Sequence, residues 1–135
     1  MRRSMPPGCF ALLVAGLLGG AGCARKPDAV ACTVTYGGES RRFSFPATDD
    51  PYAVQAVDIA GRFLFKATYI REPSRAASIN LYAYERADDG DRLLQEAKYA
   101  PSPALGVGAR HGFTGRQLLY SQNQRELEYW CELSR

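Results

Sequence analysis

The chain has 135 residues, of which 46% are apolar and 23% charged, so it has the length of one small domain and a composition typical of folded proteins. Its single histidine excludes a metal centre built from several histidines. A formal net charge of +3 is too small to indicate a nucleic-acid-binding protein.

The first 22 residues have the layout of an export signal. Arg2 and Arg3 form a basic head, an apolar run of 14 residues extends from Cys9 to Gly22, and small residues precede Cys23. A helix that spans a bilayer needs about 20 apolar residues, so a permanent span is the weaker interpretation. Losing Arg2 and Arg3 with the signal leaves 15 basic against 14 acidic residues, a net charge of +1, so no electrostatic argument for nucleic acid or anionic lipid remains.

The signal ends in Gly20-Ala21-Gly22-Cys23, which resembles the lipobox of bacterial lipoprotein precursors, although the usual pattern has leucine where Gly20 stands. This resemblance covers residues 1–23. It implies that Cys23 becomes the first residue and carries fatty chains such as palmitate, and two or more chains make anchoring stable. No Asp follows Cys23, which by the same resemblance implies the outer membrane, with the protein facing the periplasm. The alternative is an ordinary export signal cut near Ala21.

The expected organisation is thus a signal peptide (1–22), a lipid-anchored tether (23–30) and one β-domain (31–135). A short export signal before a small disulfide-closed β-domain is similar to many small proteobacterial lipoproteins. Cys32 and Cys131 remain for the folded part, in a compartment that permits disulfides. A disulfide between them would close a loop of 99 residues, for which the chain-entropy model gives about 4.7 kcal/mol. The alternative is a pair of unlinked buried thiols.

The rest of the chain alternates apolar and polar residues with a period of two, which predicts β-strands. We expect a hairpin at Gly37-Gly38 that sets Cys32 opposite Phe43. Apolar faces in register predict a single antiparallel β-sandwich or partly open barrel of about seven strands, with Cys32 and Cys131 both facing the core. The expected strands cover residues 31–36, 39–45, 55–59, 62–70, 77–86, 91–100, 116–121 and 125–133.

The turn at Asp88-Asp89-Gly90 decides the register of the two strands beside it. A three-residue loop sets Leu81 opposite Ala97, Ile79 opposite Tyr99 and Glu85 opposite Leu93, whereas a two-residue loop would slip every side chain to the other face. We therefore expect the longer loop, with a positive φ at Gly90. The interpretation of Asp88, Asp89 and Asp91 as a calcium site is disfavoured, because hairpin turns favour Asp for backbone reasons.

The long connection 101–114 carries the remaining chemical candidates. His111 is the only potential general base near neutral pH, and we expect it to be a solvated loop residue without a catalytic role. Gly106-Val107-Gly108 lacks the strand–turn–helix setting of a dinucleotide turn. We therefore predict no catalytic residues, no metal and no small-molecule cofactor.

Tyr82, Tyr84 and Trp130 fall on the strand faces opposite to the core. Solvent-facing Tyr and Trp are enriched at recognition surfaces, so these three are candidate binding residues. The alternative is a covered second face, or cross-strand pairs that only stabilise the sheet.

These features predict a non-catalytic, lipid-anchored envelope protein whose β-domain binds a protein or another envelope component. Two narrower hypotheses are an accessory lipoprotein of a secretion or assembly machine, and an inhibitor of a cell-wall-degrading enzyme that inserts the loop around Gly106–Gly112 into the enzyme's cleft. An enzyme is the third class, and it would need a concave pocket that contains His111 or two close carboxylates.

Overall fold

The computed structural model describes residues 26–104 and 109–135. The predicted signal, Cys23 and Gly106-Val107-Gly108 lie outside these residues. The described part forms eight β-strands and one short 3-10 helix, η1, in this order: β1 (Ala29–Tyr36), β2 (Glu39–Pro46), η1 (Pro51–Ala53), β3 (Val57–Ile59), β4 (Phe63–Ile70), β5 (Ser78–Glu85), β6 (Arg92–Tyr99), β7 (Gln117–Tyr120) and β8 (Glu126–Ser134).

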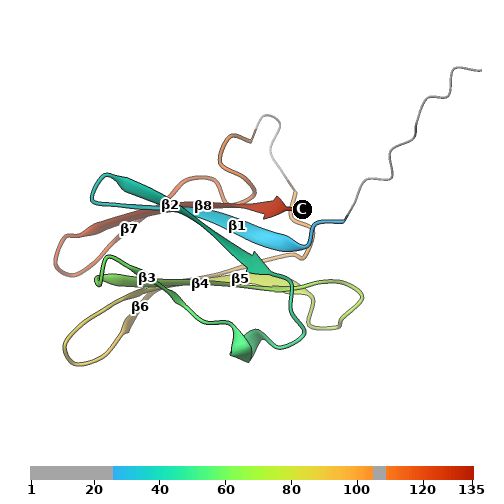
Figure 1. Ribbon diagram of the computed structural model, residues 1–135, viewed down its shortest axis with the longest axis horizontal. Helices are drawn as coiled ribbons and strands as arrows, with labels where there is room; N and C mark the ends of the chain where they lie inside the picture. The colour runs from blue at the N-terminus through green and yellow to red at the C-terminus, as the bar shows by residue number, and fades with distance from the viewer. Residues whose placement is uncertain (1–25, 105–108) are drawn as a thin grey trace, which may run out of the picture.

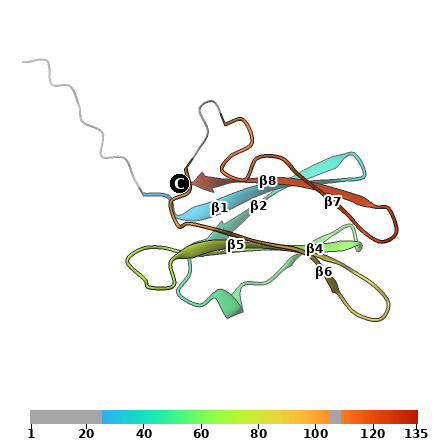
Figure 2. The same ribbon diagram turned by 180° about the vertical axis from the view of Figure 1, so that it is seen from behind.

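The strands form two antiparallel sheets of four strands each, packed face to face (Figure 1). One sheet has the order β2-β1-β8-β7, and we call it the terminal sheet because the first and last strands lie at its centre. The other has the order β3-β4-β5-β6, and we call it the middle sheet. Figure 2 shows the same layers from behind, with η1 beyond the middle sheet, on the side away from the terminal sheet. The predicted all-β sandwich is confirmed.

Alternation along the strands builds the core between the sheets. On β4 every second residue from Phe63 to Tyr69 faces inward and is buried, and on β5 Ile79, Leu81 and Ala83 do the same. The terminal sheet contributes the inward residues of β1, β2 and β8. Its buried members are Val30, Cys32, Val34, Phe45, Leu127, Tyr129 and Cys131.

The strands confirm the predicted elements, with ends that differ by one or two residues. The hairpin at Gly37-Gly38 pairs Cys32 with Phe43, as predicted. The largest correction to the domain boundary is at the start, where β1 begins at Ala29 rather than 31. Val30 is fully buried and pairs with Phe45 and Leu133, so it belongs to the domain and not to a tether.

The β5–β6 hairpin confirms the predicted register near its open end and corrects it near the turn. Ile79 faces Tyr99 and Leu81 faces Ala97, and the φ of Gly90 is positive (119°). Beyond Ala83 the register shifts, so that Leu93 pairs with Tyr84 rather than with Glu85. The expectation of Glu85 opposite Leu93 is therefore wrong, because the bulge inserts one extra residue into β6.

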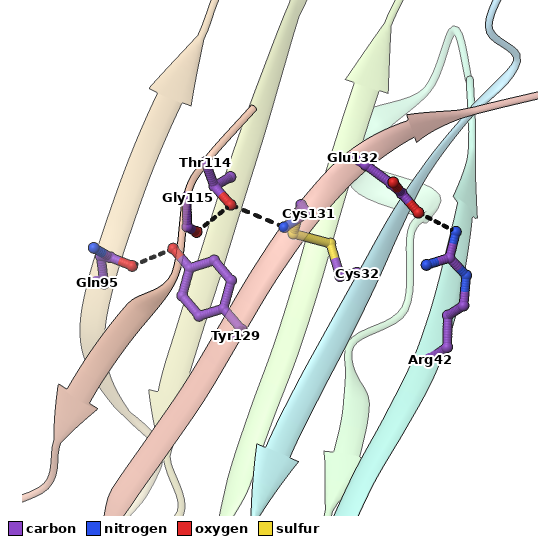
Figure 3. The surroundings of a disulfide bond; sticks show 8 residues. All are labelled: Cys32, Arg42, Gln95, Thr114, Gly115, Tyr129, Cys131 and Glu132. Atoms are coloured by element: carbon purple, nitrogen blue, oxygen red, sulfur yellow. Dashed lines mark hydrogen bonds and ion pairs between the residues drawn. A yellow bond between two sulfur atoms is a disulfide. The ribbon is translucent and has the colours of Figure 1, made fainter. Parts of the chain in front are cut away.

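The predicted disulfide joins β1 to β8 within the terminal sheet (Figure 3). Cys32 and Cys131 lie directly opposite each other, with their Cα atoms 4.1 Å apart, and both are fully buried. The backbone of Cys131 points away from β1: its N–H donates to Thr114 Oγ1 (2.9 Å) and its carbonyl accepts from the N–H of Phe113 (3.0 Å). The two cysteines therefore form a non-hydrogen-bonded pair, the position at which residues of neighbouring antiparallel strands lie closest. Their disulfide links the two ends of the domain.

Candidate functional site

The outer face of the middle sheet gathers aromatic and polar side chains from three neighbouring strands. The pairing of β4, β5 and β6 places the outward residues in rows across the sheet, on both sides of the bulge in β6. One row is apolar, from Leu64 through Tyr84 to Leu93. The next row runs from Lys66 through Tyr82 to Glu96, and the following one runs from Thr68 through Asn80 to Lys98.

Tyr82 and Tyr84 lie side by side on β5. Their rings are nearly parallel, at 14°, with centroids 6.5 Å apart. The ammonium of Lys66 lies 5.1 Å from the centroid of the Tyr82 ring, within the range of a cation–π contact. Partial burial, and then the nearby Glu96 carboxylate, raises the pKa of the Tyr82 hydroxyl above its ordinary value. The Tyr82 hydroxyl therefore stays protonated at neutral pH and is available as a donor.

Tyr52 adds a third aromatic ring to this surface, from η1. Its side chain is 94% exposed, the highest value among the large apolar or aromatic side chains of the described residues. The turn that carries it is held firmly: Asp50 Oδ1 accepts from the N–H of Tyr52 (3.0 Å), and the carbonyl of Asp50 accepts from the N–H of Ala53 (3.3 Å). An aromatic ring on a fixed turn, with little contact to its own protein, is typical of a recognition residue.

A hollow of about 260 Å³ lies between η1 and the outer face of the middle sheet. Thr68 and Ile70 are buried although they point outward. The lining combines aromatic, polar and charged side chains, namely Pro51, Tyr52, Lys66, Thr68, Ile70, Asn80 and Tyr82. We call the exposed Tyr52 and Leu93 and the half-buried Tyr82 and Tyr84, together with this hollow, the aromatic face.

Trp130 does not belong to the aromatic face. It lies on the outer side of β8 in the terminal sheet, where it is half-buried and its ring contacts that of His111 edge to face, with centroids 5.7 Å apart. The three aromatic residues that the sequence singles out therefore divide between opposite outer faces of the sandwich. His111 is half-buried against Trp130, which corrects the expectation of a fully solvated loop residue.

The described end of the long connection is fastened to β8 (Figure 3). Thr114 and Phe113 bond to the backbone of Cys131, and the backbone of Gly112 approaches so closely that a Cβ there would lie 2.0 Å from the Cys131 carbonyl oxygen. Arg116 extends the attachment through a 2.7 Å ion pair with Glu128. The inhibitor hypothesis therefore depends on residues 105–108, which lie outside the described part.

A second hollow, of about 400 Å³, opens at the end of the sandwich where the described chain begins. Lys26, Arg71 and Glu72 contribute its charges, and Tyr69 its aromatic wall. Within residues 26–104 and 109–135, no group of three or more His, Cys, Asp or Glu side chains is arranged to hold a metal ion. In the same residues, no helix has the length and apolar character needed to cross a membrane.

The positions of two members of the aromatic face do not follow from the sequence pattern. Leu93 is predicted to face the core with Ala97 and Tyr99, but the bulge turns it outward, where it is 53% exposed, and Leu94 packs against the core instead. Tyr52 falls in a segment without clear periodicity. Only a local sequence pattern indicates the position of Tyr52. Asp50-Pro51 is a typical start for a capped turn, and this turn presents the next side chain to solvent.

No protein-family model, no curated protein and no solved structure matches this chain.

Proposed function

We propose that this protein is a non-catalytic binding module, anchored by lipid on Cys23 in a bacterial outer membrane and facing the periplasm. The observation that carries the binding role is the aromatic face, on which Tyr52 and Leu93 are exposed beside Tyr82 and Tyr84. Exposed apolar and aromatic side chains that gather on one face, here beside two half-buried tyrosines, are typical of recognition sites. The partner is a protein or another envelope component.

The short link to Cys23 supports the anchored arrangement. Lys26 is the first described residue, and three residues of extended chain reach at most about 11 Å. An acylated Cys23 would therefore hold the domain directly against the membrane, with the start of β1 nearest to the lipid. The aromatic face belongs to the sheet that does not carry the chain ends, so the anchor leaves it open to a partner.

The arrangement of the titratable side chains in the described residues favours a binding role over a catalytic one. His111, the candidate general base, packs on Trp130 of the terminal sheet, whereas the hollow of the aromatic face belongs to the middle sheet. The titratable groups that line this hollow are two tyrosines and Lys66. None of them is paired there with a second group in the manner of a nucleophile and its base.

Site-specific photo-cross-linking in growing cells tests this proposal. Leu93 on the aromatic face and Leu118 on the terminal sheet are matched positions, since both are leucines on outer faces, 53% and 42% exposed. A benzoylphenylalanine at position 93 is expected to form a discrete adduct with a protein or a glycan, and the same probe at 118 is expected to form none. Absence of an adduct at 93, or identical adducts at both positions, contradicts the proposal.

A further inference from the structure

The hollow of the aromatic face has the two-sided chemistry of a sugar-binding site. Tyr52 and Tyr82 supply aromatic walls, and Thr68 and Asn80 supply a polar floor. Aromatic rings carry negative charge on their faces, so they pack well against the weakly positive C–H groups of a sugar ring. Hydroxyl, amide and ammonium groups then bind the hydroxyls at the edge of the same ring.

The polar floor is arranged in advance and keeps part of its hydrogen-bonding capacity free. The Asn80 amide donates to Ser78 Oγ (3.1 Å) and, at 3.5 Å, to Thr68 Oγ1. These bonds fix the amide orientation, so the Asn80 carbonyl oxygen is directed elsewhere and can accept from a ligand hydroxyl. Thr68 is almost fully buried, so its hydroxyl forms a rigid part of the floor.

The charge of the lining selects among sugars. Lys66 is the one charged residue among the seven that line the hollow. Among the described residues Lys66 forms no ion pair, and Glu96 lies on the far side of Tyr82. A carboxylate on the ligand would complement this ammonium.

The size of the hollow limits the occupant to one ring. Sites for drug-sized ligands measure about 300–1,000 Å³, and this hollow of about 260 Å³ is open to solvent on its outer side. A longer glycan would therefore place one residue in the hollow and continue across Tyr82 and Tyr84. We infer that the hollow binds an acidic sugar ring, a hexopyranose with a carboxylate, within a longer glycan. This inference rests on the proposed function, since it names the partner of the same face.

Saturation-transfer NMR on the full chain, purified from membranes in detergent, tests the inference with two matched tetrasaccharides. Tetragalacturonate carries carboxylates and maltotetraose does not, while both are α-1,4-linked hexopyranoses. Tetragalacturonate is expected to bind, with a dissociation constant raised roughly tenfold by Tyr52→Ala and by Lys66→Gln. Tyr120→Ala removes another exposed tyrosine, which lies on the terminal sheet, and Lys98→Gln removes a neighbouring ammonium outside the hollow, so both are expected to leave binding unchanged.

Three results overturn the inference: no binding of tetragalacturonate, equal binding of maltotetraose, or binding that Tyr52→Ala leaves intact. Tyr52 is almost fully exposed, so its truncation leaves the fold unaffected, and a change in affinity reports on the contact with the sugar. A protein adduct at position 93 together with no sugar binding would overturn this inference alone and leave the proposed function standing. Absence of both would overturn the two together.

Discussion

Gly112 is the one glycine, among the six with positive φ in the described residues, at which an added Cβ would collide with another segment. Its φ is +59°, and a Cβ built on it lies 2.0 Å from the carbonyl oxygen of Cys131. Gly115, three residues further along, has a similar φ of +65°, yet a Cβ there meets nothing within 4 Å. The two glycines therefore separate the cost of a left-handed backbone from the cost of a steric clash.

We expect Gly115→Ala to lower the free energy of unfolding by about 1 kcal/mol, since it introduces only the unfavourable φ. Gly112→Ala adds the clash and displaces the segment from β8, so it is expected to cost at least about 3 kcal/mol. Urea denaturation of the two variants measures the difference. Equal losses would contradict the close approach at Gly112.

Tyr129 is the largest fully buried side chain, and its hydroxyl hydrogen-bonds to Gln95 Oε1 across the two sheets (Figure 3). Burial raises the pKa of this hydroxyl well above its ordinary value, so it is protonated and acts as the donor. Tyr129→Phe keeps the ring contact with Phe65 and leaves Gln95 without its donor, at an expected cost of about 1–2 kcal/mol. The exposed Tyr52→Phe change is the control and should change the free energy of unfolding by less than about 0.5 kcal/mol. If Tyr129→Phe leaves the free energy of unfolding unchanged, the hydrogen bond to Gln95 does not contribute to stability.

At the scale of single residues, the sequence predicts which side chains face inward and misses those placed by irregular backbone. Cys32, Cys131 and the inward residues of β4 and β5 follow from strict alternation. Tyr52 does not, because a 3-10 turn of three residues has no period to read. The contact between the rings of His111 and Trp130 does not follow from alternation either, because it depends on how the long connection folds back onto β8.

The β3–β4 turn is held by a carboxylate that links it to a second turn. Asp58 accepts from the N–H of Gly61 (2.9 Å) and from Arg86 Nη1 (2.7 Å), and Arg86 lies just after β5. The hydrogen bond from Gly61, and then the Arg86 guanidinium, lower the pKa of Asp58 below its ordinary value of 3.8. The ionised form therefore favours folding above this ordinary pKa, and the contribution is lost as the pH falls through the lowered value.

We expect Asp58→Asn to lower the free energy of unfolding near pH 7 by about 0.5 kcal/mol, since Asp58 is half-exposed and solvent screens the pair. The difference from the unmodified protein should shrink as the pH falls below 3.8, because protonation of Asp58 then removes the charge that the variant already lacks. Thermal unfolding at several pH values measures it, with Asp49→Asn as a matched exposed change in the β2–β3 connection. A difference that stays constant down to the lowest pH would contradict the role of the charge.

At the scale of elements, the sequence predicts the strands well and the irregularities poorly. Strand ends differ from expectation by one or two residues because hydrophobic alternation fades gradually at hairpin ends. The bulge near Leu94 is invisible to the pattern, since Leu93 and Leu94 are equally apolar and either one satisfies the core position. For this reason the pattern predicts Leu93 in the core, whereas the structure places it on the aromatic face.

The disulfide acts on the whole molecule, because it ties the first strand to the last across 99 residues. The double variant Cys32→Ala/Cys131→Ala avoids buried hydroxyls and releases this constraint on the unfolded chain. We expect a loss of about 2–5 kcal/mol, measured by urea denaturation without reductant. When the unmodified protein is reduced under denaturing conditions and then refolded, the urea midpoint of its refolding should equal that of the double variant. A stability equal to that of the unmodified protein would show that packing alone closes the fold.

At the scale of the molecule, the sequence predicts a disulfide-closed sandwich and does not assign strands to sheets. Alternation separates inward from outward residues, but it does not show that β5 and β8 lie in different layers. Alternation therefore predicts only a shared outward orientation for Tyr82 and Trp130, and the topology places them on opposite faces. The aromatic face becomes visible only when η1, β5 and β6 are brought together.

Lipid on Cys23 is expected to hold the proposed binding module at a membrane. Mass spectrometry of the N-terminal peptide from the protein expressed in a Gram-negative host tests it directly, with Cys23→Ala as the control. We expect a mature chain that begins at Cys23 with a diacylglyceryl group on its sulfur, and an unprocessed chain in the control. A free thiol at position 23, or a mature chain of the same length in both proteins, would contradict the anchor and the location derived from it.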